Sequence, residues 1–167
     1  YTNTFSKSLG SAFRIAYMVL PDHLARRYRG EMAFYSCTVP AIDQLALARF
    51  MQRGEFERHV NRLRTHARDV RDAFLATLKE SLPQGSFSVA GHDAGLHFVL
   101  GFPEIDDARF AESLAENSVR MPSLREFSIS ENDATNRSRY VVQYLRLSTT
   151  QAQAAALAIA RAYAPTH

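Results

Sequence analysis

Hydrophobic positions recur at helical spacing along residues 55–81, the most periodic part of the chain. Steps of three and four residues place these positions on one stripe, which predicts a long amphipathic helix, Glu55–Ser81, closed by Pro83-Gln-Gly85. Shorter helices are predicted at Asp22–Ala33 and Ala41–Gln52, with Gly54 ending the second. The stripe consists of Phe56, Val60, Leu63, Ala67, Val70, Phe74 and Leu78.

After Pro83 the pattern changes to short apolar runs that are typical of strands. A helix is predicted at Asp106–Asn117, with acidic residues at its start where the helix dipole favours them. An Ala-rich helix, Thr149–Tyr163, closes the chain, and the polar segment Ser128–Arg139 is predicted to be a loop. This part of the chain is expected to form a small α+β domain. The predicted strands are Phe87–Ala90, Leu96–Leu100, Val119–Met121 and Tyr140–Leu147.

One further strand is predicted earlier, at Arg14–Leu20, where a short apolar run ends at Pro21. We expect it to be buried. A buried strand of the parallel type needs strand neighbours and helices on both faces, and the two helices that follow cannot supply these. We therefore expect a missing part of the fold upstream, and the absence of an initiator Met also suggests a chain that begins inside a longer protein.

The composition is that of a soluble globular protein, with 46% hydrophobic and 22% charged residues among 167. No apolar run reaches 18 residues, so no membrane span is predicted, and no signal peptide is recognisable. The single cysteine, Cys37, cannot form an internal disulfide, so a reducing, cytoplasmic setting is expected. No Cys/His cluster has zinc spacing, so no metal site is predicted. We expect Cys37 to be a small apolar filler.

Six arginines lie between Arg53 and Arg71 against three acidic residues. Such a stripe could contact phosphate or nucleic acid. Because charges of both signs alternate along it, the solvated face of the long helix is the favoured interpretation.

The segment Thr4-Phe-Ser-Lys7, followed by Arg14, carries the candidate chemistry. A Schiff base requires an amine that can be neutral near pH 7, which a desolvated lysine can supply. The hydroxyls of Thr4 and Ser6 can hydrogen-bond a phosphate, and the guanidinium of Arg14 can neutralise it. Together these residues are typical of a site for a phosphorylated aldehyde.

Residues 1–21, YTNTFSKSLGSAFRIAYMVLP, are similar to the lysine motif of class I/II aminotransferases. The similarity continues through Gln44, GEFERHVNRLR at 54–64 and AGLH at 94–97. It also includes Pro122 and YLRLS at 144–148. These segments most resemble the MocR/GabR subfamily, transcription regulators that join a GntR-type winged helix to an aminotransferase-like domain. Ser11 and Ala16 stand where family members usually carry proline and glycine, and Arg125 and Phe127 replace the usual aromatic pair near Pro122.

The resemblance implies an α/β protein of aminotransferase fold type I in truncated form. Residues 1–53 would belong to the cofactor-binding large domain, 54–82 to the connecting helix and 83–167 to the small α+β domain. It also implies that Lys7 holds pyridoxal 5'-phosphate as a Schiff base, with Thr4, Ser6 and Arg14 on the phosphate. Arg146, predicted on a strand, would grip the carboxylate of an amino acid through a bidentate pair.

The expected function is that of an effector-binding domain in a MocR-type regulator. The alternative is a competent aminotransferase that transfers an amino group between an amino acid and a 2-oxo acid. A homodimer is expected in the parent protein, with DNA contacted only through an upstream winged helix. The residues that would stack on the pyridoxal ring and protonate its nitrogen would also lie upstream of Lys7.

Overall fold

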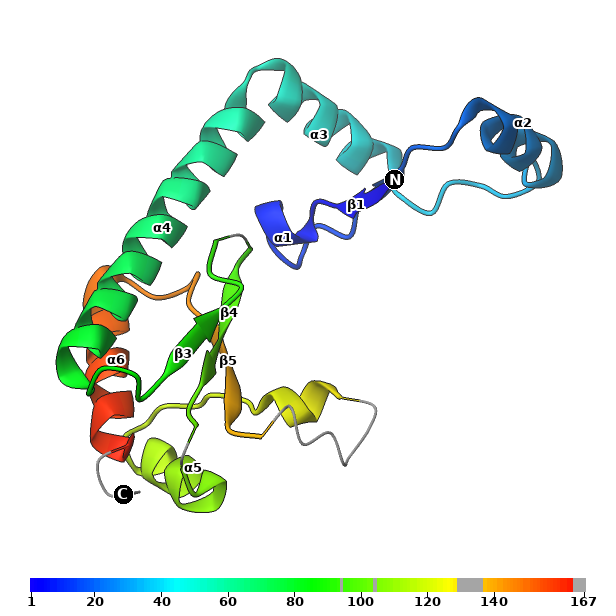
Figure 1. Cartoon of the computed structure of the whole chain (residues 1–167). Coiled ribbons are helices and arrows are strands. Elements are labelled where there is room, and N and C mark those ends of the chain that lie inside the picture. Colours follow the sequence, from blue (N-terminus) through cyan, green and yellow to red (C-terminus); the bar gives the residue numbers. More distant parts are fainter. Residues whose placement is uncertain (94, 104, 129–136, 164–167) are drawn as a thin grey trace. The chain divides into compact units, whose positions relative to one another are not determined.

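The computed structural model describes residues 1–93, 95–103, 105–128 and 137–163 (Figure 1). The described residues divide into two compact units, Tyr1–Arg64 and Thr65–His167, and the boundary falls inside one long helix. The elements are β1 (Thr2–Thr4), α1 (Ser6–Leu9), β2 (Ala16–Met18), α2 (Asp22–Glu31), α3 (Ala41–Gln52), α4 (Glu55–Ser81), β3 (Ser88–Ala90), β4 (His97–Gly101), α5 (Asp107–Glu116), the 3-10 helix η1 (Leu124–Phe127), β5 (Arg139–Gln143) and α6 (Thr149–Tyr163).

In the first unit, β1 and β2 form an antiparallel pair, with Thr2 opposite Met18 and Thr4 opposite Ala16. The strand predicted at Arg14–Leu20 is thus present but short, and its expected burial is wrong, because Ala16–Met18 are exposed. The physical reason is that β2 pairs only with β1 among the described strands, so the sheet is two strands wide. A sheet this narrow cannot bury a strand on both faces.

Much apolar surface remains exposed in this unit. Its buried hydrophobic residues are only Ile15 and Leu47 among those described. Cys37 is exposed as well, so its expected role as an apolar filler is wrong. The large hydrophobic residues on the surface of the unit are Tyr1, Phe13, Tyr17, Met18, Val19, Leu24, Tyr28, Phe34, Tyr35, Ile42 and Leu45.

The helices α2, α3 and α4 confirm the periodic pattern of the sequence, and α3 and α4 have the predicted bounds. Gly54 separates α3 from α4 with φ +67°, a conformation that glycine adopts without strain. Along α4 the predicted stripe is half-buried at Phe56, Val60 and Leu63 and buried from Ala67 onward. Five of the six arginines are exposed, as the solvated-face interpretation expects. The sixth, Arg71, is half-buried and donates to the carbonyl of His92 at 2.8 Å.

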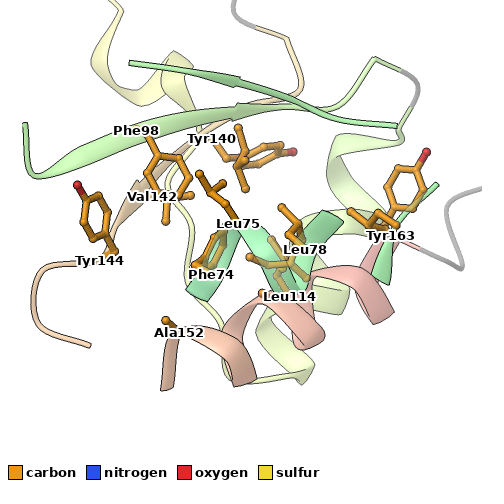
Figure 2. Packing of buried hydrophobic residues seen from close by; sticks show 14 of the residues in the cluster. Phe74, Leu75, Leu78, Phe98, Leu114, Tyr140, Val142, Tyr144, Ala152 and Tyr163 are labelled. Atoms are coloured by element: carbon orange, nitrogen blue, oxygen red, sulfur yellow. The ribbon is translucent and has the colours of Figure 1, made fainter. Parts of the chain in front are cut away.

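The second unit combines helices and strands, as predicted for the chain after Pro83, and it also contains the later turns of α4. Its antiparallel sheet has the order β3-β4-β5. The register of β4 and β5 sets Phe98 opposite Val142 and Leu100 opposite Tyr140, so core residues are cross-strand neighbours on one face. Figure 2 shows Phe98 pointing from the sheet toward Phe74 of α4, and the two rings meet edge to face with centroids 5.6 Å apart.

Two predicted strands need correction. No strand forms at Val119–Met121. Pairing with β5 is limited to an isolated bridge at Ser123 and a hydrogen bond to the carbonyl of Pro122, because Pro122 has no N–H to donate. From Ser123 a capping box with Glu126 starts η1 instead. The residues 129–136 of the predicted Ser128–Arg139 loop lie outside the described residues.

The strand predicted at Tyr140–Leu147 ends earlier, at Gln143. A turn follows, in which Leu147 N–H donates to the carbonyl of Tyr144. Ser148 and Gln151 then exchange backbone-to-side-chain hydrogen bonds of 2.9 and 3.1 Å, which start α6 at its predicted first residue. β5 ends at Gln143 because its partner there, His97, is the first residue of β4.

A buried tyrosine links the sheet to α5. The ring of Tyr140 packs against Phe110, with centroids 5.3 Å apart, and its hydroxyl donates to Asp107 Oδ1 at 2.7 Å. Burial, and next the hydrogen bond to Asp107, raise the pKa of Tyr140 above its ordinary value. Tyr140 therefore stays neutral in the folded unit well above the pH at which a free tyrosine ionises.

Candidate functional site

Lys7 lies in α1, a helix of four residues between the paired strands β1 and β2. The hairpin therefore displays the lysine on a short connection whose two ends are tied together. Gly10 closes α1 with φ +99°. The Lys7 side chain is exposed and has no hydrogen bond or ion pair with another described residue. The desolvated setting that the sequence suggested for this amine is thus not formed by the described residues.

The hydroxyls of Thr4 and Ser6 are engaged inside the same hairpin. Thr4 Oγ1 lies 3.2 Å from the carbonyl oxygen of Ile15 and 3.2 Å from Ser6 Oγ. Ser6 Oγ in turn donates to the carbonyl of Phe13. Since each hydroxyl has a single hydrogen to donate, both are committed to holding the loop. They could contact a phosphate only by giving up these bonds.

Arg14, which directly precedes the buried Ile15, is exposed. Its guanidinium forms no hydrogen bond or ion pair in the part of the chain that the structure describes. The hairpin thus presents one primary amine and one guanidinium, both available to a ligand. This pair of groups suits a phosphorylated aldehyde, because the amine can bond to the carbonyl carbon and the guanidinium can pair with the phosphate.

α4 supports the lysine segment from one side. The ring of Phe56 meets that of Phe5 edge to face with centroids 5.7 Å apart. One turn later, His59 Nε2 lies 2.7 Å from the carbonyl oxygen of Ser8. The sequence pattern does not point to His59, because 51 residues separate it from Ser8. The only local signal is that Phe56 and His59 share one face of the helix at a spacing of three.

Arg146 lies in the turn between β5 and α6, not on a strand as predicted, and it is exposed. Within this turn Tyr144 donates through its hydroxyl to the carbonyl of Gly95, at 3.2 Å. Two of the motifs singled out in the sequence, AGLH and YLRLS, are thereby brought together. Arg146 itself forms no hydrogen bond or ion pair with the described residues, so its guanidinium is available.

The predicted site residues divide between the two units: Thr4, Ser6, Lys7 and Arg14 belong to the first and Arg146 to the second. Each unit also has a hollow. One of about 490 Å³ lies beside β2 and α2, and one of about 570 Å³ lies beside β5 and α6 and includes Pro122 and Phe127. Neither of these two hollows is lined by a predicted site residue.

The described residues contain no cluster of three or more His, Cys, Asp or Glu side chains placed to hold a metal ion. In the same part of the chain, no helix combines the length and the apolar character needed to cross a membrane.

Comparison with known proteins identifies the family. Residues 1–162 match the family Aminotransferase class I and II. The chain belongs to this family.

Among curated relatives, the HTH-type transcriptional regulators YhdI and YdeL of Bacillus subtilis are 34% and 36% identical, each over 100 residues. These alignments cover 60% of this chain and 21% of either regulator. The probable rhizopine catabolism regulatory protein MocR of Rhizobium meliloti is 28% identical over 102 residues, 61% of this chain and 20% of that protein. The chain thus spans about a fifth of the curated relatives that it matches.

Solved aminotransferases share the fold. The multiple substrate aminotransferase of Thermococcus profundus matches 99% of this chain with a TM-score of 0.81 at 20% identity. The kynurenine aminotransferase of Pyrococcus horikoshii matches 99% with a TM-score of 0.79 at 22% identity. In both cases the match covers 40% of the solved chain. The predicted α/β fold of aminotransferase type I, present in part, is therefore confirmed.

A third neighbour bears on the cofactor. The α-aminoadipate aminotransferase LysN of Thermus thermophilus was solved with N-(5'-phosphopyridoxyl)-L-leucine, and it matches 99% of this chain and 42% of its own, with a TM-score of 0.77 at 18% identity. Membership of the family implies pyridoxal phosphate for this chain. Lys7 and Arg14 fit that group, whereas Thr4 and Ser6 fit it only if their present hydrogen bonds are exchanged.

Proposed function

We propose that this chain is the effector-binding, pyridoxal-phosphate-dependent aminotransferase-like domain of a MocR-type transcription regulator. The observation that carries the proposal is that one hairpin of an aminotransferase-family chain presents both an available amine, that of Lys7, and an available guanidinium, that of Arg14. The similarity to HTH-type regulators supports the regulatory role. The proposed division of the chain is a cofactor-binding part at residues 1–53, a connecting helix at 54–82 and a small domain at 83–167.

In this proposal Lys7 forms the covalent link and Arg14 binds the phosphate. When bound, pyridoxal phosphate supplies an electron-withdrawing ring to an attached amino acid. Thr4 and Ser6 keep the hairpin closed around Lys7, and they add a phosphate contact if their hydroxyls rotate away from the backbone carbonyls. When its amine is not bonded to the cofactor, Lys7 would be able to accept or return a proton.

Arg146 is proposed to bind the carboxylate of the amino-acid ligand. A guanidinium can pair with a carboxylate through two parallel N–H donors, which fixes orientation as well as position. The turn that carries Arg146 is held by the Tyr144 hydroxyl at Gly95 and by the capping box at the start of α6. These contacts restrict the turn while leaving the guanidinium exposed.

The proposed partners are an amino acid, a second copy of the protein and, through a winged helix outside this chain, DNA. The alternative function is a competent aminotransferase, which the solved neighbours favour. The two differ in turnover. An enzyme converts many equivalents of an amino acid and a 2-oxo acid, whereas a regulator changes its DNA affinity on binding and forms at most one equivalent of product.

The cofactor assignment is tested by trapping. The full-length gene product is incubated with pyridoxal phosphate, reduced with borohydride and mapped by peptide mass. The chain has only two lysines, Lys7 and the exposed Lys79 of α4, so the second is an internal control. We expect the label on Lys7 in the unaltered protein and in Lys79→Arg, and its loss in Lys7→Arg. Equal labelling of both lysines would refute the assignment.

A further inference from the structure

His59 acts on the segment that carries Lys7. Its Nε2 atom lies 2.7 Å from the carbonyl oxygen of Ser8, the residue directly after Lys7. A carbonyl oxygen only accepts, so Nε2 carries the hydrogen of this bond. The last carbonyls of a helix have no partner within it, and His59 satisfies one of them in α1.

The short helix depends on such contacts. α1 has only four residues, far fewer than an isolated helix needs to be stable. α4 contacts both of its ends, since the Phe56 ring packs on Phe5 before Lys7 and His59 binds Ser8 after it. Because the Lys7 side chain is exposed and forms no hydrogen bond or ion pair with other described residues, the backbone of α1 is the main restraint on the position of its amine.

We infer that His59 is a positioning residue for the cofactor lysine, holding the turn that carries Lys7 through the Ser8 carbonyl. The inference rests on the proposed function in assigning Lys7 to pyridoxal phosphate. It adds that the first turns of α4 hold the lysine at a fixed point of the hairpin. Losing the bond leaves α1 to fray and spreads the amine over more positions, which lowers the fraction of chains ready to bond the cofactor.

Three substitutions separate the hydrogen bond from the bulk of the ring. His59→Phe keeps a ring but has no N–H, whereas His59→Gln keeps an N–H donor. The matched control is His66→Phe on the same helix, because His66 is exposed and its side chain forms no hydrogen bond with a described residue. Circular dichroism checks that each variant is folded. If His59→Phe does not fold, His59→Leu against His59→Gln provides the same comparison.

The first readout is amide hydrogen exchange of the cofactor-free, full-length gene product, in peptides covering residues 5–13. Ser8 and Leu9 donate their amides to the carbonyl of Phe5, so their protection reports whether α1 is formed. We expect exchange about 5- to 30-fold faster in His59→Phe, partial recovery in His59→Gln and no change in His66→Phe. Unchanged exchange in His59→Phe, or an equal change in His66→Phe, would overturn the inference.

The second readout is borohydride trapping at limiting pyridoxal phosphate. The label on Lys7, relative to Lys79, should fall by a similar factor in His59→Phe and recover in His59→Gln. Absence of Lys7 labelling in the unaltered protein overturns the proposed function, and with it the role of His59 toward the cofactor. Normal labelling of Lys7 in all variants, with unchanged exchange, overturns the His59 inference alone.

Discussion

Replacing Tyr140 by phenylalanine removes one hydroxyl and leaves the packing of the second unit intact. Tyr140 is 4% exposed, and its ring contacts Phe102 and Phe110, contacts that phenylalanine retains. The lost interaction is the 2.7 Å bond to Asp107. Hydrogen bonds to charged groups contribute about 1.5–3 kcal/mol. Because Asp107 is only half-buried, water can replace the lost donor, so we expect a cost of about 1–2 kcal/mol near pH 7.

The same hydroxyl makes the difference pH-dependent. Its pKa in the folded unit is raised, chiefly by burial and next by the hydrogen bond to Asp107, while the unfolded chain keeps the ordinary value of about 10. The stabilisation is therefore fully present below pH 10. It is lost above pH 10 at about 1.4 kcal/mol per pH unit, because only the unfolded chain then releases this proton. The wild-type advantage over Tyr140→Phe should vanish near pH 11.

Urea unfolding at pH 7, 9 and 11 measures both quantities, and the remaining tyrosines cancel because both proteins contain them. A double-mutant cycle with Asp107→Ala, which removes the acceptor, should give a coupling of about 1–2 kcal/mol at pH 7. The control is Asp106→Ala, since Asp106 caps α5 through Ala108 and Arg109 and makes no bond to Tyr140; its coupling with Tyr140→Phe should be near zero. A stability difference that stays constant or grows from pH 7 to pH 11 would refute the reasoning.

Three further predictions concern other parts of the chain. In the full-length gene product, Arg146→Ala should weaken amino-acid binding about 10- to 100-fold without changing cofactor loading, and Arg146→Lys should restore little of the lost affinity. An absorbance titration with the amino acid measures both variants, and unchanged affinity in Arg146→Ala contradicts the assignment. Phe74→Ala should lower the free energy of unfolding by about 3–5 kcal/mol in urea, because Phe74 is 1% exposed. Phe127→Ala should lower it by less than about 0.5 kcal/mol, because Phe127 is 62% exposed. Equal losses in the two variants would contradict the described core. Gly54→Ala should lower the free energy of unfolding by about 1 kcal/mol, because alanine is strained at a φ of +67°. Steric clash adds nothing, since an added Cβ meets no atom within 4 Å. A variant that is more stable than the wild type in urea unfolding would contradict this strain.

The long helices could be predicted from the sequence because their causes are local. The bounds of α3, α4 and α6 follow from apolar residues at helical spacing and from stop signals such as Gly54 and Pro83. The family motif around Lys7 was equally visible, since it lies within one short segment.

Strand limits, burial and contacts required the tertiary structure, because they depend on residues distant in sequence. Val119–Met121 does not form a strand, and β5 stops at Gln143 opposite the first residue of β4, since pairing is decided by the partner strand. Tyr17 and Cys37 are exposed because no described element covers them. The bond from His59 to Ser8 joins residues 51 apart, and no periodicity or motif encodes such a pair. Local spacing thus determined which long segments are helical, whereas the contacts of α4 with Phe5 and Ser8 were decided only by the tertiary structure.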